Sequence, residues 1–262
     1  MQHSPAVVPT ALALVWALIA LVLGSYVAAA RRHPRWSPWR TLSFVGGGAL
    51  LLVALSSSVV HWAHADLRGH MFQHLLLGMF APLLFVMAAP VTLFLASVGP
   101  RTARRTVRVL HSRPVRVLSH PIAALLLNVG GMVLLYSTQL FVLSRSSAWL
   151  HVLVHYHFLA AGYLFAWSIA GPDPAPGRPS VRYRAVVLFV AIAVHSTLGK
   201  LMYVHGWPQG AGVARSELEA AAQWMYYGGD LAEMLLIAAL GAVWYAERGR
   251  SLASARTEAT SH

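Results

Sequence analysis

Long apolar segments alternate with short polar segments along the whole chain. A helix needs about 20 apolar residues to cross a bilayer core of about 30 Å. The segments that reach this length lie at residues 6–30, 41–60, 70–89, 120–143, 150–170, 183–204 and 219–245. The pattern predicts an all-α integral membrane protein, a seven-transmembrane helical bundle that forms a single domain over residues 1–262.

The composition agrees with a membrane protein. Hydrophobic residues make up 57% of the chain and charged residues 11%, whereas soluble proteins carry about a quarter charged residues. No stretch of domain size lies outside the apolar segments. We therefore expect a multi-pass protein whose main surroundings are the lipid bilayer.

The basic residues are distributed unevenly between the two sides of the predicted bundle. Of the 20 Lys and Arg residues, 16 lie at 31–40, 90–119, 171–182 with Arg184 at its edge, or after 246. The positive-inside rule makes these segments cytoplasmic, with the N-terminus outside and the C-terminus cytoplasmic. Topology thus accounts for the net charge of +12, and we expect no nucleic acid as a partner. The arginine-rich part of the second segment should lie along the inner membrane interface.

Histidines gather at the outer ends of the predicted spans. His70 and His74 are four residues apart and share one face of a helix, and His151 and His155 repeat this spacing at the outer entrance of the fifth span. Polar rings at membrane depth are costly unless they are bound. Helical bundles hold metals with side chains from facing helices, so the two pairs predict a metal site.

Three further polar residues lie within the last two spans. His195 is in the sixth span, and Asp230 and Glu233 are three residues apart in the seventh. Carboxylates at membrane depth are functional candidates. The candidate metal ligands are therefore His70, His74, His151, His155, His195, Asp230 and Glu233. A real site would use three or four of them, and the deeper residues could form one site with the histidine pairs or a second one.

The absence of cysteine restricts the ligands to imidazole, carboxylate and thioether groups. Thioethers favour Cu(I), whereas carboxylates favour zinc. Methionines near the proposed cluster are Met71, Met202, Met225 and Met234. A histidine or methionine in a membrane helix is more often a packing residue than a ligand. The methionines favour copper only slightly, so the residues alone leave both copper and zinc open.

The sequence also makes local predictions. His64 and Asp66 are expected in a short outer loop, and Pro82 is expected to kink the third span. The pattern Ser216-x-x-Glu219 is typical of a capping box and predicts the start of the last helix.

Several short motifs in the chain resemble the CtaG family of cytochrome c oxidase assembly factors. They are His70-Met71-x-x-His74-Leu75-Leu76-Leu77 with Ala81-Pro82 and Ala89-Pro90, His155-x-His157-Phe158 with Gly162, the loop Gly171-Pro172-Asp173-Pro174, and His195 with Gly199. The resemblance covers roughly residues 40–245. It implies a protein of the bacterial plasma membrane that supplies copper to the haem-copper centre of cytochrome c oxidase, with an oxidase subunit as partner.

We therefore expect a metallochaperone with an outward-facing histidine cluster and no enzymatic turnover, and a homodimer is compatible with the sequence. Three alternatives remain open from the residues alone. One is a seven-span zinc-dependent membrane hydrolase with Asp230 or Glu233 as general base. The others are a haem-binding electron carrier with two histidine ligands and a copper permease.

Overall fold

The computed structural model describes the backbone of residues 7–260 and the side chains of residues 13–249. In chain order its helices, with η for a π-helix, are α1 (Val7–Arg31), α2 (Pro38–Ala54), α3 (Ser57–Ala65), α4 (Leu67–Leu75), η1 (Leu76–Phe80), α5 (Ala81–Met87), α6 (Pro90–Ser97), α7 (Pro100–Leu110), α8 (Arg113–Leu118), α9 (Pro121–Leu125), η2 (Leu126–Gly130), α10 (Gly131–Ser137), α11 (Leu140–Ser146), α12 (Ala148–Ala170), α13 (Val181–His205) and α14 (Arg215–Thr260). The described residues contain no strand, which confirms an all-α protein.

Five helical stretches are long and apolar enough to cross a membrane: α1, α4–η1–α5, α12, α13 and the first part of α14. Two more qualify only as bent pairs. One is α2 with α3, bent by 53°, and the other is α9–η2–α10 with α11, bent by 82°. The protein thus has five to seven candidate spans, and the count of seven stays a prediction.

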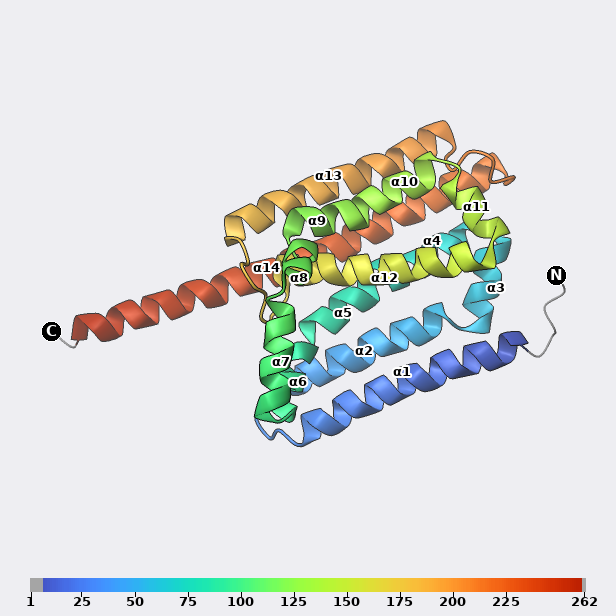
Figure 1. Ribbon diagram of the computed structural model, residues 1–262. Helices are drawn as coiled ribbons and strands as arrows, with labels where there is room; N and C mark the ends of the chain where they lie inside the picture. Colours follow the sequence, from blue (N-terminus) through green and yellow to red (C-terminus); the bar gives the residue numbers. More distant parts are fainter. Residues whose placement is uncertain (1–6, 261–262) are drawn as a thin grey trace.

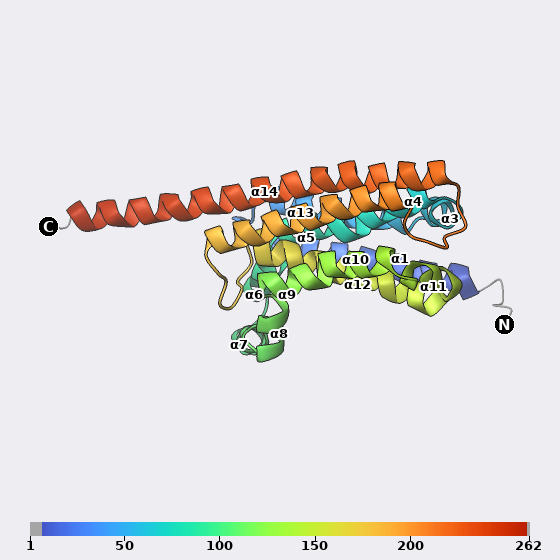
Figure 2. The same ribbon diagram turned by 90° about the horizontal axis from the view of Figure 1, so that it is seen from above.

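The continuous stretch α4–η1–α5 forms the centre of the bundle. It packs against α2, α3, α12 and α14, and the views in Figures 1 and 2 show the other long helices around it. In its most apolar part 67% of the residues are buried, whereas the corresponding value for α1 is 17%. The histidine-rich motif of the sequence is therefore inside the protein and not on its lipid-facing surface.

The second predicted span is broken near Ser56, between α2 and α3. This break corrects the prediction that His64 lies in a loop. The Ser56 side chain accepts a hydrogen bond from the N–H of Val59 at 3.4 Å and caps α3. His64 therefore lies on a helix, not in a loop. Asp66 does lie between helices, where its carboxylate accepts the N–H of Arg68 at 2.7 Å, and hydrogen bonding to the Arg68 side chain lowers the pKa of Asp66.

The start of the last helix also differs from the prediction. α14 begins at Arg215, so Ser216 lies inside the helix and the predicted capping box is wrong. Glu219 instead accepts a hydrogen bond from the Arg215 side chain at 2.7 Å. Glu217 reaches the neighbouring helix and accepts the N–H of Leu67 at 2.7 Å. Glu219 is therefore engaged within its own helix, whereas Glu217 holds the start of α14 against α4.

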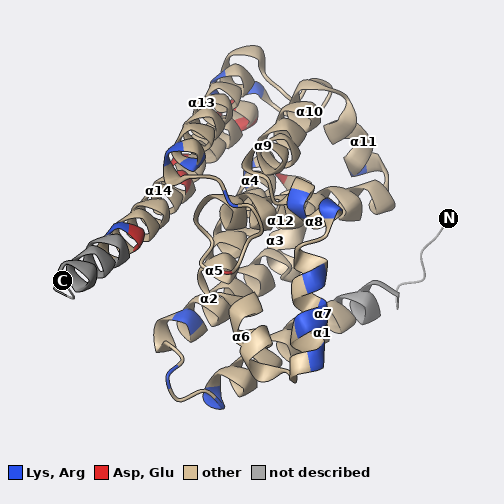
Figure 3. Cartoon of the chain, turned by 60° about the vertical axis from the view of Figure 1, so that its left-hand side comes forward, with Lys and Arg blue, Asp and Glu red and all other residues tan. Residues whose placement is uncertain are grey.

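The short helices α6, α7 and α8 lie at one end of the bundle, where α7 runs across the long helices (Figure 1). The arginines of α7 are exposed there (Figure 3). Pro82, which was expected to kink the third span, is the second residue after the π-helix η1. Proline and π-turns are both known causes of helix kinks.

A buried carboxylate ties the loop before α13 to the start of α6. Asp173 is 1% exposed, and it accepts hydrogen bonds from the N–H of Val91 at 3.1 Å and from the N–H and hydroxyl of Thr92 at 2.7 and 2.6 Å. Arg178 donates to the carbonyl oxygens of Gly171 and Asp173 at 2.6 and 3.0 Å. The Gly171-Pro172-Asp173-Pro174 motif is therefore a structural connection between two helix ends.

Replacing Asp173 with alanine should destabilise the protein by at least about 2 kcal/mol, because two buried N–H groups lose a charged acceptor. Chemical unfolding in detergent, followed by circular dichroism, measures this change. Thr92→Val removes only one of the bonds and should cost about 1 kcal/mol. Equal stability of Asp173→Ala and wild type would contradict the assignment.

Candidate metal-binding site

Three of the predicted ligands line one small cavity at the end of the bundle opposite to α7. His70 and His74 enter it from α4 and His155 enters it from α12, with Leu135 and Phe158 among the apolar walls. Both histidines of α4 are buried. The i,i+4 spacing therefore does place the two rings on one interior face, and we refer to this space as the histidine cavity.

His70 is held by aromatic neighbours. Its Nε2 lies 3.3 Å from the hydroxyl of Tyr136, and its ring meets those of Phe141 and His155 edge-on, with centroids 5.0 and 6.1 Å apart. The same hydroxyl lies 3.7 Å from the sulfur of Met71. Tyr136 thus places a hydroxyl group beside His70. The sequence pattern did not single out this tyrosine.

His155 has two oxygen neighbours and cannot satisfy both while it is neutral. Its Nδ1 lies 2.8 Å from the carbonyl oxygen of His151, and its Nε2 lies 3.1 Å from Oε1 of Gln73. The amide nitrogen of Gln73 is already committed to the carbonyl oxygen of Ala54 at 2.8 Å. A neutral imidazole has one N–H. If Nδ1 donates to the carbonyl, the lone pair of Nε2 faces the oxygen of Gln73 and stays without a hydrogen-bond donor.

A row of histidine rings leads from the surface to His155. The ring centroids of His64 and His151 are 4.8 Å apart, and those of His151 and His155 are 4.2 Å apart. His64 is exposed and His151 is partly buried. These rings connect the histidine cavity to the outside.

His74 has a neighbour that sequence spacing could not reveal. Its Nε2 lies 3.2 Å from the sulfur of Met132, a buried residue of α10. A thioether and an imidazole in direct contact are both ligands for Cu(I). Met132 is 58 residues from His74 in the chain, so only the tertiary structure brings the two together. By contrast, Met234 is 58% exposed and lies away from this region.

The deeper candidates form a separate group. His195 is fully buried, and its Nδ1 lies 3.2 Å from Oε1 of Glu233. The angles at this contact do not satisfy a hydrogen bond, since Nδ1 has no hydrogen-bond partner. Asp230 accepts a hydrogen bond from Ser196 at 3.2 Å instead. The expected grouping of His195 with Asp230 is therefore replaced by a pairing of His195 with Glu233.

The candidate ligands do not converge on one point. Within residues 13–249, no group of three or more His, Asp or Glu side chains is placed to coordinate a metal. Two ligand nitrogens on one tetrahedral ion are about 3.3 Å apart. The imidazole rings of the histidine cavity would have to rotate toward one another to reach that distance. Their donor chemistry, with a thioether beside them, fits copper.

The fold therefore defines a class of protein. It is a helical membrane protein with buried imidazole and thioether groups between its candidate spans. The family model described as cytochrome c oxidase caa3 assembly factor (Caa3_CtaG) matches residues 19–247. The chain belongs to this family, as the resemblance of its motifs predicted, and the family role is the assembly of cytochrome c oxidase.

Similar proteins occur in mycobacteria. The uncharacterized proteins Mb0105 of Mycobacterium bovis and MT0111 of Mycobacterium tuberculosis are each 35% identical over 198 residues, which is 73% of this chain and 30% of theirs. The uncharacterized protein ML1998 of Mycobacterium leprae is 34% identical over 194 residues, or 69% and 29% of the two chains. The chain thus spans about three tenths of the length of these relatives. No solved structure matches it.

The ring of His195 occupies space that a side chain at position 229 would fill. Substitution of Gly229 therefore tests the buried pair His195 and Glu233. A Cβ at position 229 would lie 1.9 Å from Cε1 of His195. Gly229→Ala should therefore displace the ring and destabilise the protein by about 1–3 kcal/mol, measured by chemical unfolding in detergent.

Gly241→Ala is the matched control, because it lies on the same helix and its Cβ would meet nothing within 4 Å. The control should be as stable as wild type or more stable, since alanine favours the helix over glycine. If the two variants unfold at the same denaturant concentration, His195 does not lie against Gly229.

Proposed function

We propose that this assembly factor binds a copper ion in the histidine cavity and supplies it to the copper centre of a cytochrome c oxidase subunit. The observation that supports the proposal is that imidazoles from two helices, His70 and His74 of α4 and His155 of α12, line one cavity. Copper is the cargo of this process and not a resident cofactor. No bond of a substrate is broken, so no nucleophile is needed.

The neighbours of the cavity favour copper over zinc. The sulfur of Met132 contacts His74 at 3.2 Å, and thioether ligands select Cu(I). Neither Asp230 nor Glu233 lines the histidine cavity. A zinc hydrolase site there would therefore have no carboxylate to act as general base.

The row of histidines gives the ion a path in and out. His64 is exposed at the end of the bundle, and His151 lies between it and His155. Arg145 donates to the carbonyl oxygen of His64 at 2.7 Å and anchors α11 beside this entrance. An oxidase subunit that docks over α3 and α11 could exchange the ion through these rings one ligand at a time.

The distribution of charge supports an outward-facing site. The exposed arginines of α7 lie at the end of the bundle away from α3 and α11 (Figures 1 and 3). Under the positive-inside rule that end is cytoplasmic. If each bent pair counts as one span, the chain crosses the plasma membrane seven times as a single domain, with its N-terminus outside and its C-terminus inside.

Copper binding to the purified protein tests the proposal. Titration with Cu(I) against a competing chelator, without oxygen, should show tight binding of a first equivalent by wild type. His74→Ala and His70→Ala should each weaken that binding at least tenfold, because each removes a direct ligand. His157→Ala is the control, since its Nε2 lies 2.9 Å from the carbonyl oxygen of Leu127, outside the histidine cavity.

The role in delivery needs a second readout. In cells that depend on this factor, His74→Ala should lower the copper content and activity of the oxidase, while His157→Ala should not. Wild-type protein that takes up no copper, or a His74→Ala variant that binds copper and matures the oxidase normally, would overturn the proposal.

A further inference from the structure

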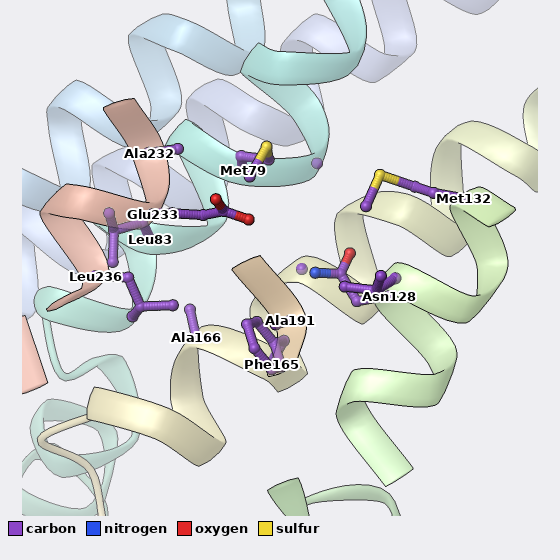
Figure 4. Close-up of a pocket in the computed structure, with 13 residues that line it drawn as sticks. Met79, Leu83, Asn128, Met132, Phe165, Ala166, Ala191, Ala232, Glu233 and Leu236 are labelled. Atoms are coloured by element: carbon purple, nitrogen blue, oxygen red, sulfur yellow. The ribbon is translucent and has the colours of Figure 1, made fainter. Parts of the chain in front are cut away.

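A second cavity lies deeper between the helices and contains a buried carboxylate (Figure 4). Its walls come from both π-helices and from α5, α10, α12, α13 and α14. Most of the lining is apolar, with Leu83, Phe165 and Leu236 as examples. The polar and sulfur-bearing side chains are Met79, Asn128, Met132 and Glu233. We refer to this space as the deep cavity.

Glu233 is incompletely satisfied in this position. The residue is 7% exposed, and its Oε2 has no hydrogen-bond partner among the described residues. His195 lies 3.2 Å from the other oxygen, but its ring nitrogens also lack hydrogen-bond partners. An unsatisfied polar group in an apolar interior costs several kcal/mol. A carboxylate oxygen without a partner in an apolar interior is a candidate ligand for a cation.

The side chains around this space suit one type of cation. In Figure 4 the carboxylate of Glu233, the amide of Asn128 and the sulfur of Met132 point toward the same space, with Met79 beside it. Mg²⁺ and Ca²⁺ prefer six or more oxygen ligands, and only two side chains here carry oxygen. Two thioethers and one carboxylate match a soft monovalent ion, because the sulfurs bind it and the carboxylate balances its charge.

Met132 lies between the two cavities. Its side chain lines the deep cavity, and its sulfur lies 3.2 Å from Nε2 of His74, which lines the histidine cavity. An ion bound to His74 is therefore one ligand exchange away from the deep cavity. In that exchange a Cu–N bond breaks and a Cu–S bond forms, and copper stays Cu(I), so no electron or oxidant is involved.

We propose that the deep cavity is a second Cu(I) site, with Met79, Met132 and Glu233 as ligands and Met132 as the residue that passes the ion from His74. The proposal rests on the copper function proposed above. Both π-helices contribute to this cavity, and such irregular turns occur frequently at functional sites. The two sites together form a relay that leads from the outer surface toward the middle of the bundle.

Cu(I) titration of the purified protein tests this relay. Wild type should bind two equivalents, and X-ray absorption of the loaded protein should show both Cu–N and Cu–S scattering. Glu233→Gln and Met79→Leu should each bind one equivalent, with the affinity for the first unchanged and the Cu–S signal reduced. Met79→Leu conserves volume and should leave the fold intact. Met234→Leu is the matched control, because this methionine of α14 is exposed.

The outcomes separate the two proposals. Two equivalents in both Glu233→Gln and Met79→Leu, or a single equivalent in wild type that is lost in His74→Ala, would overturn the deep site and leave the histidine cavity standing. A single equivalent that is insensitive to His74→Ala but lost in Glu233→Gln would support the deep site alone and overturn the proposed role of the histidine cavity. Wild-type protein without copper would overturn both.

Discussion

The close approach of two helices at a pair of glycines sets the geometry of the whole bundle. A Cβ at position 162 of α12 would lie 2.0 Å from the carbonyl oxygen of Gly78 in η1 and 3.2 Å from Pro82. Pro82 has no N–H to donate to that carbonyl, and Gly162 has no side chain to keep it away. α12 therefore lies directly on the irregular turn of the central helix. This contact brings His155 of α12 to the histidines of α4.

The interior polar groups fall into two classes with different roles. The carboxylate of Asp173 accepts hydrogen bonds from Val91 and Thr92 and connects two helix ends. Glu233 and His195 are also buried, but Oε2 of Glu233 and both ring nitrogens of His195 have no hydrogen-bond partner. Burial of a polar group is tolerated when its partners come with the fold, as for Asp173. Where partners are missing, as at Glu233, the expected compensation is a ligand.

Copper transfer between sites requires ligands that bind well enough to capture the ion and weakly enough to release it. Neighbouring single donors, such as His151, His155, His74 and Met132, meet this requirement better than a closed set of four ligands.

The sequence by itself determined the helical membrane fold, the family and the pairing of His70 with His74 on one interior face. The fold and the histidine pairing follow from apolar segment length and helical periodicity, which are local properties of the chain. The family follows from the resemblance of its short motifs. The breaks near Ser56 and Thr138 and the start of α14 at Arg215 were not predicted, although Ser56 caps α3 through the nearby N–H of Val59. The contact of His74 with Met132 and that of Glu217 with the N–H of Leu67 were decided by the tertiary structure. These contacts join residues 58 and 150 positions apart, and no local pattern carries that information.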